Sequence, residues 1–283
     1  MCEMLGGEKV HNFESIEALM CPLCGENLAF VGNSLVCGGL RRHNFDFAKS
    51  GYVNLNTHAP TSGDDKEMAK ARKAFLRKGY YEPLAKEIAT ACGNGETLCD
   101  AGCGEGYYTE IAAKNFSAVI GVDLSKYAIE LAAKNARQSG ISERILYTVS
   151  SVYSLPLKDS SCDTVVNVFA PCVETEYSRV LKSGGKLIIA AAGRDHLKGL
   201  KETLYDTVIP NEERRDYPLK MRLAKTVSVK YDVEIFGEDI YSLFTMTPYF
   251  YRTKKESVEK LKTMERLSTL LDFEVRVYEK NDV

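Results

Sequence analysis

The sequence lacks long apolar segments, an excess of charge of one sign, internal repeats and low-complexity tracts. No apolar stretch approaches the roughly 18 residues that a membrane-spanning helix needs, and residues 1–20 carry acids where a signal peptide would be basic and then apolar. The net charge of −2 gives no overall attraction to nucleic acid, so binding of that kind would need a local basic patch. We therefore expect a cytoplasmic protein that does not enter a membrane.

The length and the cysteine content limit the fold further. A chain of 283 residues with 45% hydrophobic and 27% charged residues is typical of a globular protein of one or two domains. Its 9 cysteines occur without any sign of secretion. In such a chain, cysteines indicate metal binding or buried thiols rather than a disulfide framework.

A glycine-rich turn is the most informative motif. Residues 97–108 read TLCDAGCGEGYY, an apolar run followed by an acid and by Gly102, Gly104 and Gly106. Glycines let the backbone turn sharply at the end of a strand and approach a ligand closely. A second apolar run, residues 118–123, ends at Asp123, about 20 residues after the turn, where a ribose-binding acid stands in dinucleotide-binding folds. These features predict a site for a nucleotide-like ligand.

The details of the turn separate two ligand classes. The spacing G-x-G-x-G is tighter than the G-x-G-x-x-G of dehydrogenases, and Asp100 precedes it at the end of the strand. This combination resembles the (D/E)-x-G-x-G-x-G motif of class I S-adenosylmethionine methyltransferases.

Strands and helices alternate around this motif, which predicts an α/β fold with a parallel, doubly wound sheet. The expected strands are residues 97–101, 118–123, 145–149, 162–169 and 186–192, and the expected helices end near residue 115 or span residues 125–138 and 174–181. A helical pattern covers residues 66–92 before the sheet. After it come helical residues 197–207, 238–246 and 257–271 and strand-like residues 226–235 and 273–278.

The amino-terminal segment carries a predicted zinc site. Cys21 and Cys24 form a C-x-x-C knuckle, and Cys37 and His43 follow in the order C-x2-C-x12-C-x5-H. Four ligands of this kind suit a closed tetrahedral zinc site, and the metal supplies folding energy that a segment of this size lacks. The alternatives are buried thiols with a surface histidine, and His58 in place of His43. Redox chemistry at the C-x-x-C pair is a weaker alternative because no thioredoxin-like unit surrounds it.

Two further patterns leave alternatives open. Lys66, Lys70, Lys73 and Arg77 share one helix face, either as a solvated surface or, together with arginines of the cysteine-rich segment, as a track for RNA phosphates. The aromatic residues of that segment, Phe45, Phe47 and Tyr52, either form its core or stack on bases.

Six segments together resemble one enzyme family. They are the cysteine knuckle, HNFDFAKSGYVNLN at residues 43–56, ARKAFLRKGYYEPL at 71–84, DAGCGEGYYT at 100–109, FAPC at 169–172 and MTPYF at 246–250. The chain resembles the bacterial 23S rRNA guanine-N1 methyltransferases of the RlmA type, including the tylosin-resistance members. The spacing from Cys37 to His43 is two residues longer than the C-x3-H of this family, and residues 1–20 have no clear counterpart.

The resemblance implies methyl transfer from S-adenosylmethionine to N1 of a guanine in a domain II hairpin of 23S rRNA, with structural zinc and a Rossmann-like methyltransferase fold. It also suggests a homodimer and makes antibiotic resistance a hypothesis. The implied domains are a zinc-binding RNA-recognition domain at residues 1–56, a linker and helical connection at 57–95, and a methyltransferase domain at 96–283. The implied cofactor-binding residues are Tyr81, Asp100, Gly102, Gly104, Glu105, Gly106, Asp123, Ser151 and His196, with Ser150 as an alternative to Ser151 from fold analogy.

The segment after the fourth predicted strand is the expected acceptor loop. Phe169 could stack on a guanine flipped out of the RNA, and Pro171 and Cys172 follow it. A Pro-Cys pair also resembles the nucleophile of cytosine-C5 methyltransferases, so an RNA cytosine-C5 enzyme using Cys172 is an alternative. Guanine N1 is itself a nucleophile once its proton is lost, and it needs orientation rather than a thiol. A small-molecule methyltransferase is the third reading, with the zinc segment as a lid or dimerisation element.

Overall fold

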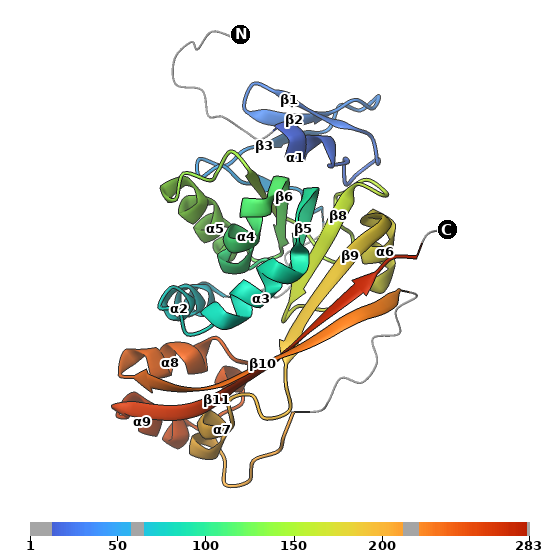
Figure 1. Cartoon of the computed structure of the whole chain (residues 1–283). Helices are drawn as coiled ribbons and strands as arrows, with labels where there is room; N and C mark the ends of the chain where they lie inside the picture. The colour runs from blue at the N-terminus through green and yellow to red at the C-terminus, as the bar shows by residue number, and fades with distance from the viewer. Residues whose placement is uncertain (1–12, 58–64, 212–220, 282–283) are drawn as a thin grey trace.

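A mostly parallel sheet of eight strands runs through the molecule (Figure 1). The computed structural model describes residues 13–57, 65–211 and 221–281. The strand order is β10-β11-β9-β8-β5-β6-β7-β4, in which β9 to β4 run parallel and β10 and β11 run antiparallel to their neighbours. The parallel strands are β4 (Val53–Asn54), β5 (Gly95–Ala101), β6 (Phe116–Asp123), β7 (Ile145–Val149), β8 (Cys162–Val168) and β9 (Leu181–Ala192).

The central strands form where apolar runs are buried on both faces. All five residues of β7 are buried, as are the last five residues of β5 and of β8, and such continuous apolar runs are typical of parallel strands covered on both sides. The predicted fold class is confirmed. Each of the five strands expected from the sequence is present, with bounds that differ by a few residues.

Helices α3 (Glu82–Cys92), α4 (Tyr107–Ala112) and α5 (Lys126–Gln138) cover one face of the sheet. The Ser125 hydroxyl accepts the Ala128 N–H and caps α5, and Asp65 caps α2 (Lys66–Leu76) in the same way through Met68. The single helical pattern predicted over residues 66–92 is two helices. The chain breaks between them at Gly79, whose φ of 86° lies in the left-handed region.

The other face is covered by α6 (Glu174–Val180) and by the amino-terminal segment, which contains α1 (Phe13–Glu17) and a small antiparallel sheet. The strands of this sheet are β1 (Leu28–Val31), β2 (Ser34–Cys37) and β3 (Asn44–Asp46). Residues 150–161, which connect β7 to β8 and are all described, contain no helix. The amino-terminal segment packs here, where Leu19 forms a bridge with Leu157. It therefore supplies part of the layer that a crossover helix would otherwise provide.

The carboxyl-terminal part extends the sheet with the long hairpin of β10 (Arg222–Phe236) and β11 (Arg266–Glu279). Figure 1 shows α7 (Lys198–Leu204), α8 (Glu238–Thr245) and α9 (Lys255–Lys262) packed along this hairpin. The helix predicted over residues 257–271 was wrong at its end, since residues 266–271 belong to β11. Leu267, Thr269, Leu271 and Phe273 are buried at a spacing of two, and burial against β10 and β9 selects the strand.

The short helices η1 (Ala113–Asn115) and η2 (Pro248–Tyr251) complete the described elements. Within residues 13–57, 65–211 and 221–281, every helix is too short or too polar to serve as a membrane span.

Candidate metal and cofactor sites

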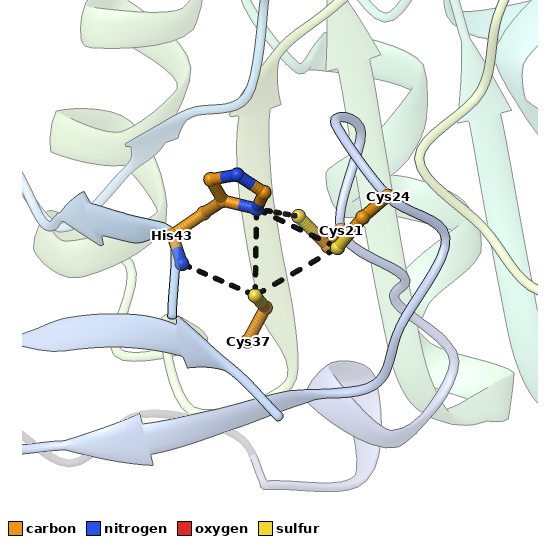
Figure 2. A group of neighbouring side chains, drawn as sticks. All are labelled: Cys21, Cys24, Cys37 and His43. Atoms are coloured by element: carbon orange, nitrogen blue, oxygen red, sulfur yellow. Dashed lines mark hydrogen bonds between the residues drawn. The ribbon is translucent and has the colours of Figure 1, made fainter. Parts of the chain in front are cut away.

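Four side chains of the amino-terminal segment meet at one point (Figure 2). The ligand atoms of Cys21, Cys24, Cys37 and His43 all lie within 4.8 Å of one another. His43 Nδ1 lies 3.4 Å from Cys21 Sγ and 3.5 Å from the Sγ atoms of Cys24 and Cys37. The Sγ atoms of Cys24 and Cys37 are 3.8 Å apart.

These distances match the edges of a zinc tetrahedron. Zn–S bonds of about 2.3 Å and Zn–N bonds of about 2.0–2.1 Å give tetrahedral edges of about 3.8 Å between sulfurs and about 3.5 Å between sulfur and nitrogen. All four positions are filled by protein, which is the arrangement of a structural rather than a catalytic zinc site. His43 takes the fourth position with the longer spacing. The alternative ligand, His58, lies outside the described residues.

The backbone around the cluster explains how the spacing closes. Gly25, with a φ of 76°, donates its N–H to Cys21 O at 2.8 Å and completes the knuckle. The Cys37 N–H donates to His43 O at 2.9 Å, and the His43 N–H points at Cys37 Sγ at 3.2 Å. The five residues between Cys37 and His43 therefore form a loop whose two ends are held together beside the ligands.

The aromatic residues of this segment form core. Phe47 is 4% exposed and lies in one core with Leu35 and Ile120, against which Phe45 is partly buried. Tyr52 is 5% exposed but belongs to the other core, with Phe75 and Leu84. The core interpretation is confirmed for Phe47, whereas Tyr52 packs in the core of the sheet domain.

The glycine turn lies at the carboxyl end of β5, between β8 and β6, where the order of the sheet reverses. Ligands of doubly wound folds bind at this point. The N–H groups of Gly102 and Cys103 both donate to Val122 O, at 2.8 and 3.1 Å. Gly102, Gly104 and Gly106 have φ angles of 90°, 56° and 85°. Because L side chains rarely adopt these angles, the turn needs glycine at each position.

The Asp123 carboxylate holds this turn at its centre. Its Oδ2 accepts the Gly104 N–H at 3.0 Å, and its Oδ1 accepts the Ser125 N–H at 2.7 Å. Each carboxylate oxygen can accept a second hydrogen bond, so the ribose hydroxyls of a cofactor fit here. Ser150 is buried beside it, with its N–H on Asp123 O at 3.0 Å, whereas Ser151 is half-buried and accepts the Tyr153 N–H.

Asp100 is buried and only partly satisfied. Its Oδ2 accepts the Thr109 hydroxyl at 2.6 Å, whereas its Oδ1 is buried and no described residue bonds to it. Burial raises the pKa of Asp100 to about 7, and the carboxylates of Asp123 and Glu105 add to this, while the bond from Thr109 lowers the pKa. A buried acceptor without a partner is costly. The ammonium group of S-adenosylmethionine carries the donors that this oxygen lacks.

Tyr81 and His196, which the family resemblance places in the cofactor pocket, lie together. The Tyr81 hydroxyl is 3.4 Å from His196 Nε2, and the Asp272 N–H donates to His196 Nδ1 at 3.3 Å. Since Nδ1 is an acceptor, a neutral ring carries its proton on Nε2 and donates it to Tyr81. Burial lowers the pKa of His196 to about 3, which keeps the ring neutral.

The expected acceptor loop lies next to the turn and to this pair. A Cβ on Gly102 would come within 2.4 Å of Ala170 Cβ. Phe169, at a φ of 54° and 48% exposed, stacks on His196 with ring centroids 6.4 Å apart. Cys172 is half-buried and packs against the core around Tyr177 on the far face of the sheet.

Several side chains at the site were missed in the sequence analysis. Asn167 Nδ2 and the Tyr177 hydroxyl both donate to Pro171 O, at 3.0 and 2.9 Å, and fix the acceptor loop. Arg72 and Tyr108 flank the glycine turn. Both stand in quoted motifs, but helical spacing alone directed attention to Lys73 and Arg77. These two instead face the sheet domain, bonded to Asn135 at 2.6 Å and to Glu110 at 2.7 Å.

Comparisons with known proteins give one consistent result. Residues 99–189 match a methyltransferase domain family, and residues 19–56 match the amino-terminal zinc ribbon of RlmA. The chain is 34% identical to the 23S rRNA (guanine(748)-N(1))-methyltransferase of Streptomyces fradiae over 67% of this chain and 68% of the relative. A protein of Micromonospora griseorubida in the same family is 34% identical over 66% and 69%.

A third relative and a solved structure extend this result. The YxjB protein of Bacillus subtilis (strain 168) is 28% identical over 91% of this chain and 95% of its own length. The crystal structure of the Bacillus subtilis YcgJ protein aligns with a TM-score of 0.50 at 18% identity, covering 72% of this chain and all of that one. The structural likeness shows the fold alone.

Proposed function

Because the chain belongs to the family of 23S rRNA (guanine-N1)-methyltransferases with an RlmA-type zinc ribbon, we propose that it methylates N1 of a guanine in 23S rRNA. S-adenosylmethionine supplies the methyl group from its sulfonium. The cofactor-binding residues in this proposal are those predicted above, with Asp100 on the methionyl end and Asp123 on the ribose.

The observation that carries the proposal is the contact between the acceptor loop and the glycine turn. With Ala170 packed directly on Gly102, a base that stacks on Phe169 lies beside the cofactor's turn. Phe169 is the exposed aromatic ring of this region, and flipped or single-stranded bases are commonly held by such rings.

The loop acts by orientation. Asn167 and Tyr177 fix the Pro171 carbonyl, so the loop presents Phe169 in one position. His196 does not serve as a general base, because its pKa of about 3 leaves it a weak proton acceptor and both ring nitrogens are engaged. In this proposal the N1 proton passes to solvent water, N1 accepts the methyl group and the neutral thioether leaves, so Cys172 forms no covalent adduct.

The RNA-binding surface in this proposal combines the zinc ribbon with the start of α2. Arg41 and Arg42 lie on the exposed loop between Cys37 and His43, and Lys66 and Lys70 are exposed on α2. Lys73 and Arg77 are left out because they bond to Asn135 and Glu110. Phosphate contacts make affinity fall steeply with salt, so a gel shift with a salt titration tests this surface.

The domain II hairpin, the homodimer, the cytoplasmic location and the domain boundaries at residues 56 and 95 remain part of this proposal. The boundary at residue 56 follows a strand that belongs to the main sheet. β4, at Val53–Asn54, pairs with Thr148 and Val149 of β7, so the end of the amino-terminal segment is also the edge of this sheet.

The decisive experiment uses purified protein, labelled S-adenosylmethionine and unmodified 23S rRNA, with the labelled nucleoside identified by mass. We expect 1-methylguanosine. Recovery of 5-methylcytidine would replace the proposal with the cytosine-C5 reaction at Cys172. Cofactor binding without incorporation into RNA would replace it with a small-molecule methyltransferase.

A further inference from the structure

We infer that Arg72 and Tyr108 form a subsite for the carboxylate of the cofactor's methionyl end. This inference rests on the proposed function, since it takes S-adenosylmethionine to be the cofactor. It adds two residues from outside the glycine turn, one from α2 and one from α4, and gives them a defined part of the ligand.

The guanidinium of Arg72 lies against the glycine turn. A Cβ placed on Gly104 would stand 3.6 Å from Arg72 Nη1, which is ordinary van der Waals contact. Arg72 is half-buried and comes from the middle of α2. Its charge acts on the hydroxyls of Tyr81, which precedes α3, and of Tyr108 on α4.

Tyr108 supplies a second, independent observation. This side chain is 8% exposed, and its hydroxyl is buried without a hydrogen-bond partner among the described residues. Burial raises the pKa of Tyr108, and the Arg72 guanidinium acts in the opposite direction, so the hydroxyl and the guanidinium interact. A buried hydroxyl without a partner is costly unless a ligand completes it, and a carboxylate accepts the O–H bond that it offers.

The charges around the turn separate the two ends of an amino acid. Burial raises the pKa of the Cys103 thiol, and Asp100, Asp123 and Glu105 raise it further, so acidic groups surround the turn. A ligand carboxylate entering this region is repelled unless a cation meets it. Arg72 offers planar donors that suit a carboxylate, while the free Asp100 Oδ1 suits the ammonium group. The two ends of the methionyl group therefore have opposite partners.

The competing explanation is that Arg72 only fixes α2 against the turn. If Arg72 had only a structural role, replacing it would lower the affinity for both ligands equally. If it binds the carboxylate, replacing it should lower the affinity only for the ligand that carries this group. The test therefore compares S-adenosylmethionine with decarboxylated S-adenosylmethionine by isothermal titration calorimetry on the full-length protein loaded with zinc.

We expect the unmodified protein to bind S-adenosylmethionine about 10 to 100 times more tightly than the decarboxylated analogue, since a charged hydrogen bond is lost. In R72Q this preference should fall to about threefold or less, with affinity for the analogue nearly unchanged. The matched control is K114Q, which removes one positive charge at an exposed residue of η1 and should keep the full preference.

Y108F keeps the experiment decisive if R72Q folds poorly, because it removes only a hydroxyl that has no partner in the described structure. We expect it to melt at or above the temperature of the unmodified protein. It should lose affinity for S-adenosylmethionine but not for the decarboxylated analogue. Equal losses for both ligands in R72Q and Y108F would overturn the inference. Failure of the unmodified protein to bind S-adenosylmethionine at all would instead overturn the proposed function.

Discussion

The zinc site and the cofactor site of this protein are completed to different degrees. In the ribbon, four ligand atoms already stand at the spacings that zinc requires, with sulfur to nitrogen distances of 3.4 to 3.5 Å. At the glycine turn, Asp100 Oδ1 and the Tyr108 hydroxyl are buried without hydrogen-bond partners among the residues that the structure describes. The turn also holds its three glycines at left-handed φ angles.

The difference shows which ligand belongs to the fold and which belongs to the reaction. Unpaired buried groups and unusual backbone angles each cost free energy, and they collect at functional sites where a ligand offsets the cost. The metal site differs, because two of its ligands, Cys21 and Cys37, are part of the buried core. Leu19 and Leu35 of the ribbon share one core with Ile120 and Leu157 of the sheet domain.

Removing the zinc should have the largest effect, because the ribbon should lose its fold together with the metal. We expect C37S to lose the metal and to lower the melting temperature of the whole chain by about 10 °C or more, because the ribbon covers the sheet. Metal analysis and calorimetry measure both quantities. The control C172S changes a half-buried cysteine outside the cluster and should keep the zinc. A sheet domain that melts at an unchanged temperature after zinc loss would show that the ribbon folds independently.

A single methyl group in the turn should give the next largest effect. In G106A, the new Cβ would lie 2.4 Å from the Tyr147 hydroxyl and 3.0 Å from Ala132 Cβ, at a φ of 85°. We expect a loss of about 3–5 kcal/mol in the free energy of unfolding, since steric overlap adds to backbone strain.

The matched control is G140A, where φ is 69° and nothing lies within 4 Å of the new Cβ. G140A should lose about 1–2 kcal/mol in the free energy of unfolding, from backbone strain without steric overlap. Urea denaturation of both variants separates the two terms. Equal losses would mean that the turn relaxes around the methyl group, and Y147F should then fail to rescue G106A.

The same contrast marks what sequence reasoning could reach. Local signals predicted the strands of the parallel sheet, the helix over residues 125–138 and the four zinc ligands, because each depends on neighbours in the chain. The strand at residues 266–271 was missed because its burial against β9 and β10 is a tertiary property. Arg72 was missed for a similar reason, since its position beside Gly104 depends on how α2 packs against a turn far along the chain.

Replacing Asp100 should change stability and cofactor binding in opposite directions. The folded pKa of about 7 exceeds the unfolded value of about 3.9. Between these values the unfolded chain ionises while the folded chain stays protonated, so stability falls as pH rises from about 4 to about 7 and is level above that. D100N removes this slope. We expect it to be more stable by up to about 4 kcal/mol at pH 8 and to bind S-adenosylmethionine at least tenfold more weakly.

Urea denaturation at pH 5 and pH 8, with calorimetry of cofactor binding, tests both parts. The control is T109V, which keeps the carboxylate and removes the hydroxyl that donates to its Oδ2. Since that bond favours ionised Asp100, T109V should raise the pKa of Asp100 further and move the end of the slope to higher pH. A D100N variant whose stability keeps the slope of the unmodified protein would assign the slope to another group.

The smallest expected effect concerns the acceptor loop, whose Pro171 carbonyl is held by two side-chain hydrogen bonds. The Tyr177 hydroxyl donates to Pro171 O at 2.9 Å and accepts from Asn167 Nδ2 at 2.7 Å, while Asn167 also reaches Pro171 directly. Y177F leaves one of these bonds, so we expect a loss of about 1 kcal/mol in stability.

The methylation rate should respond more than cofactor affinity, because the loop orients the base and does not hold the cofactor. We expect kcat to fall about threefold to tenfold, with the dissociation constant for S-adenosylmethionine changed less than twofold. Y153F, at a tyrosine that is 65% exposed, is the control and should leave both unchanged. If Y177F instead lowers the affinity for S-adenosylmethionine as much as it lowers kcat, the loop is part of the cofactor site. The contact between Ala170 and Gly102 would then couple base orientation to cofactor binding.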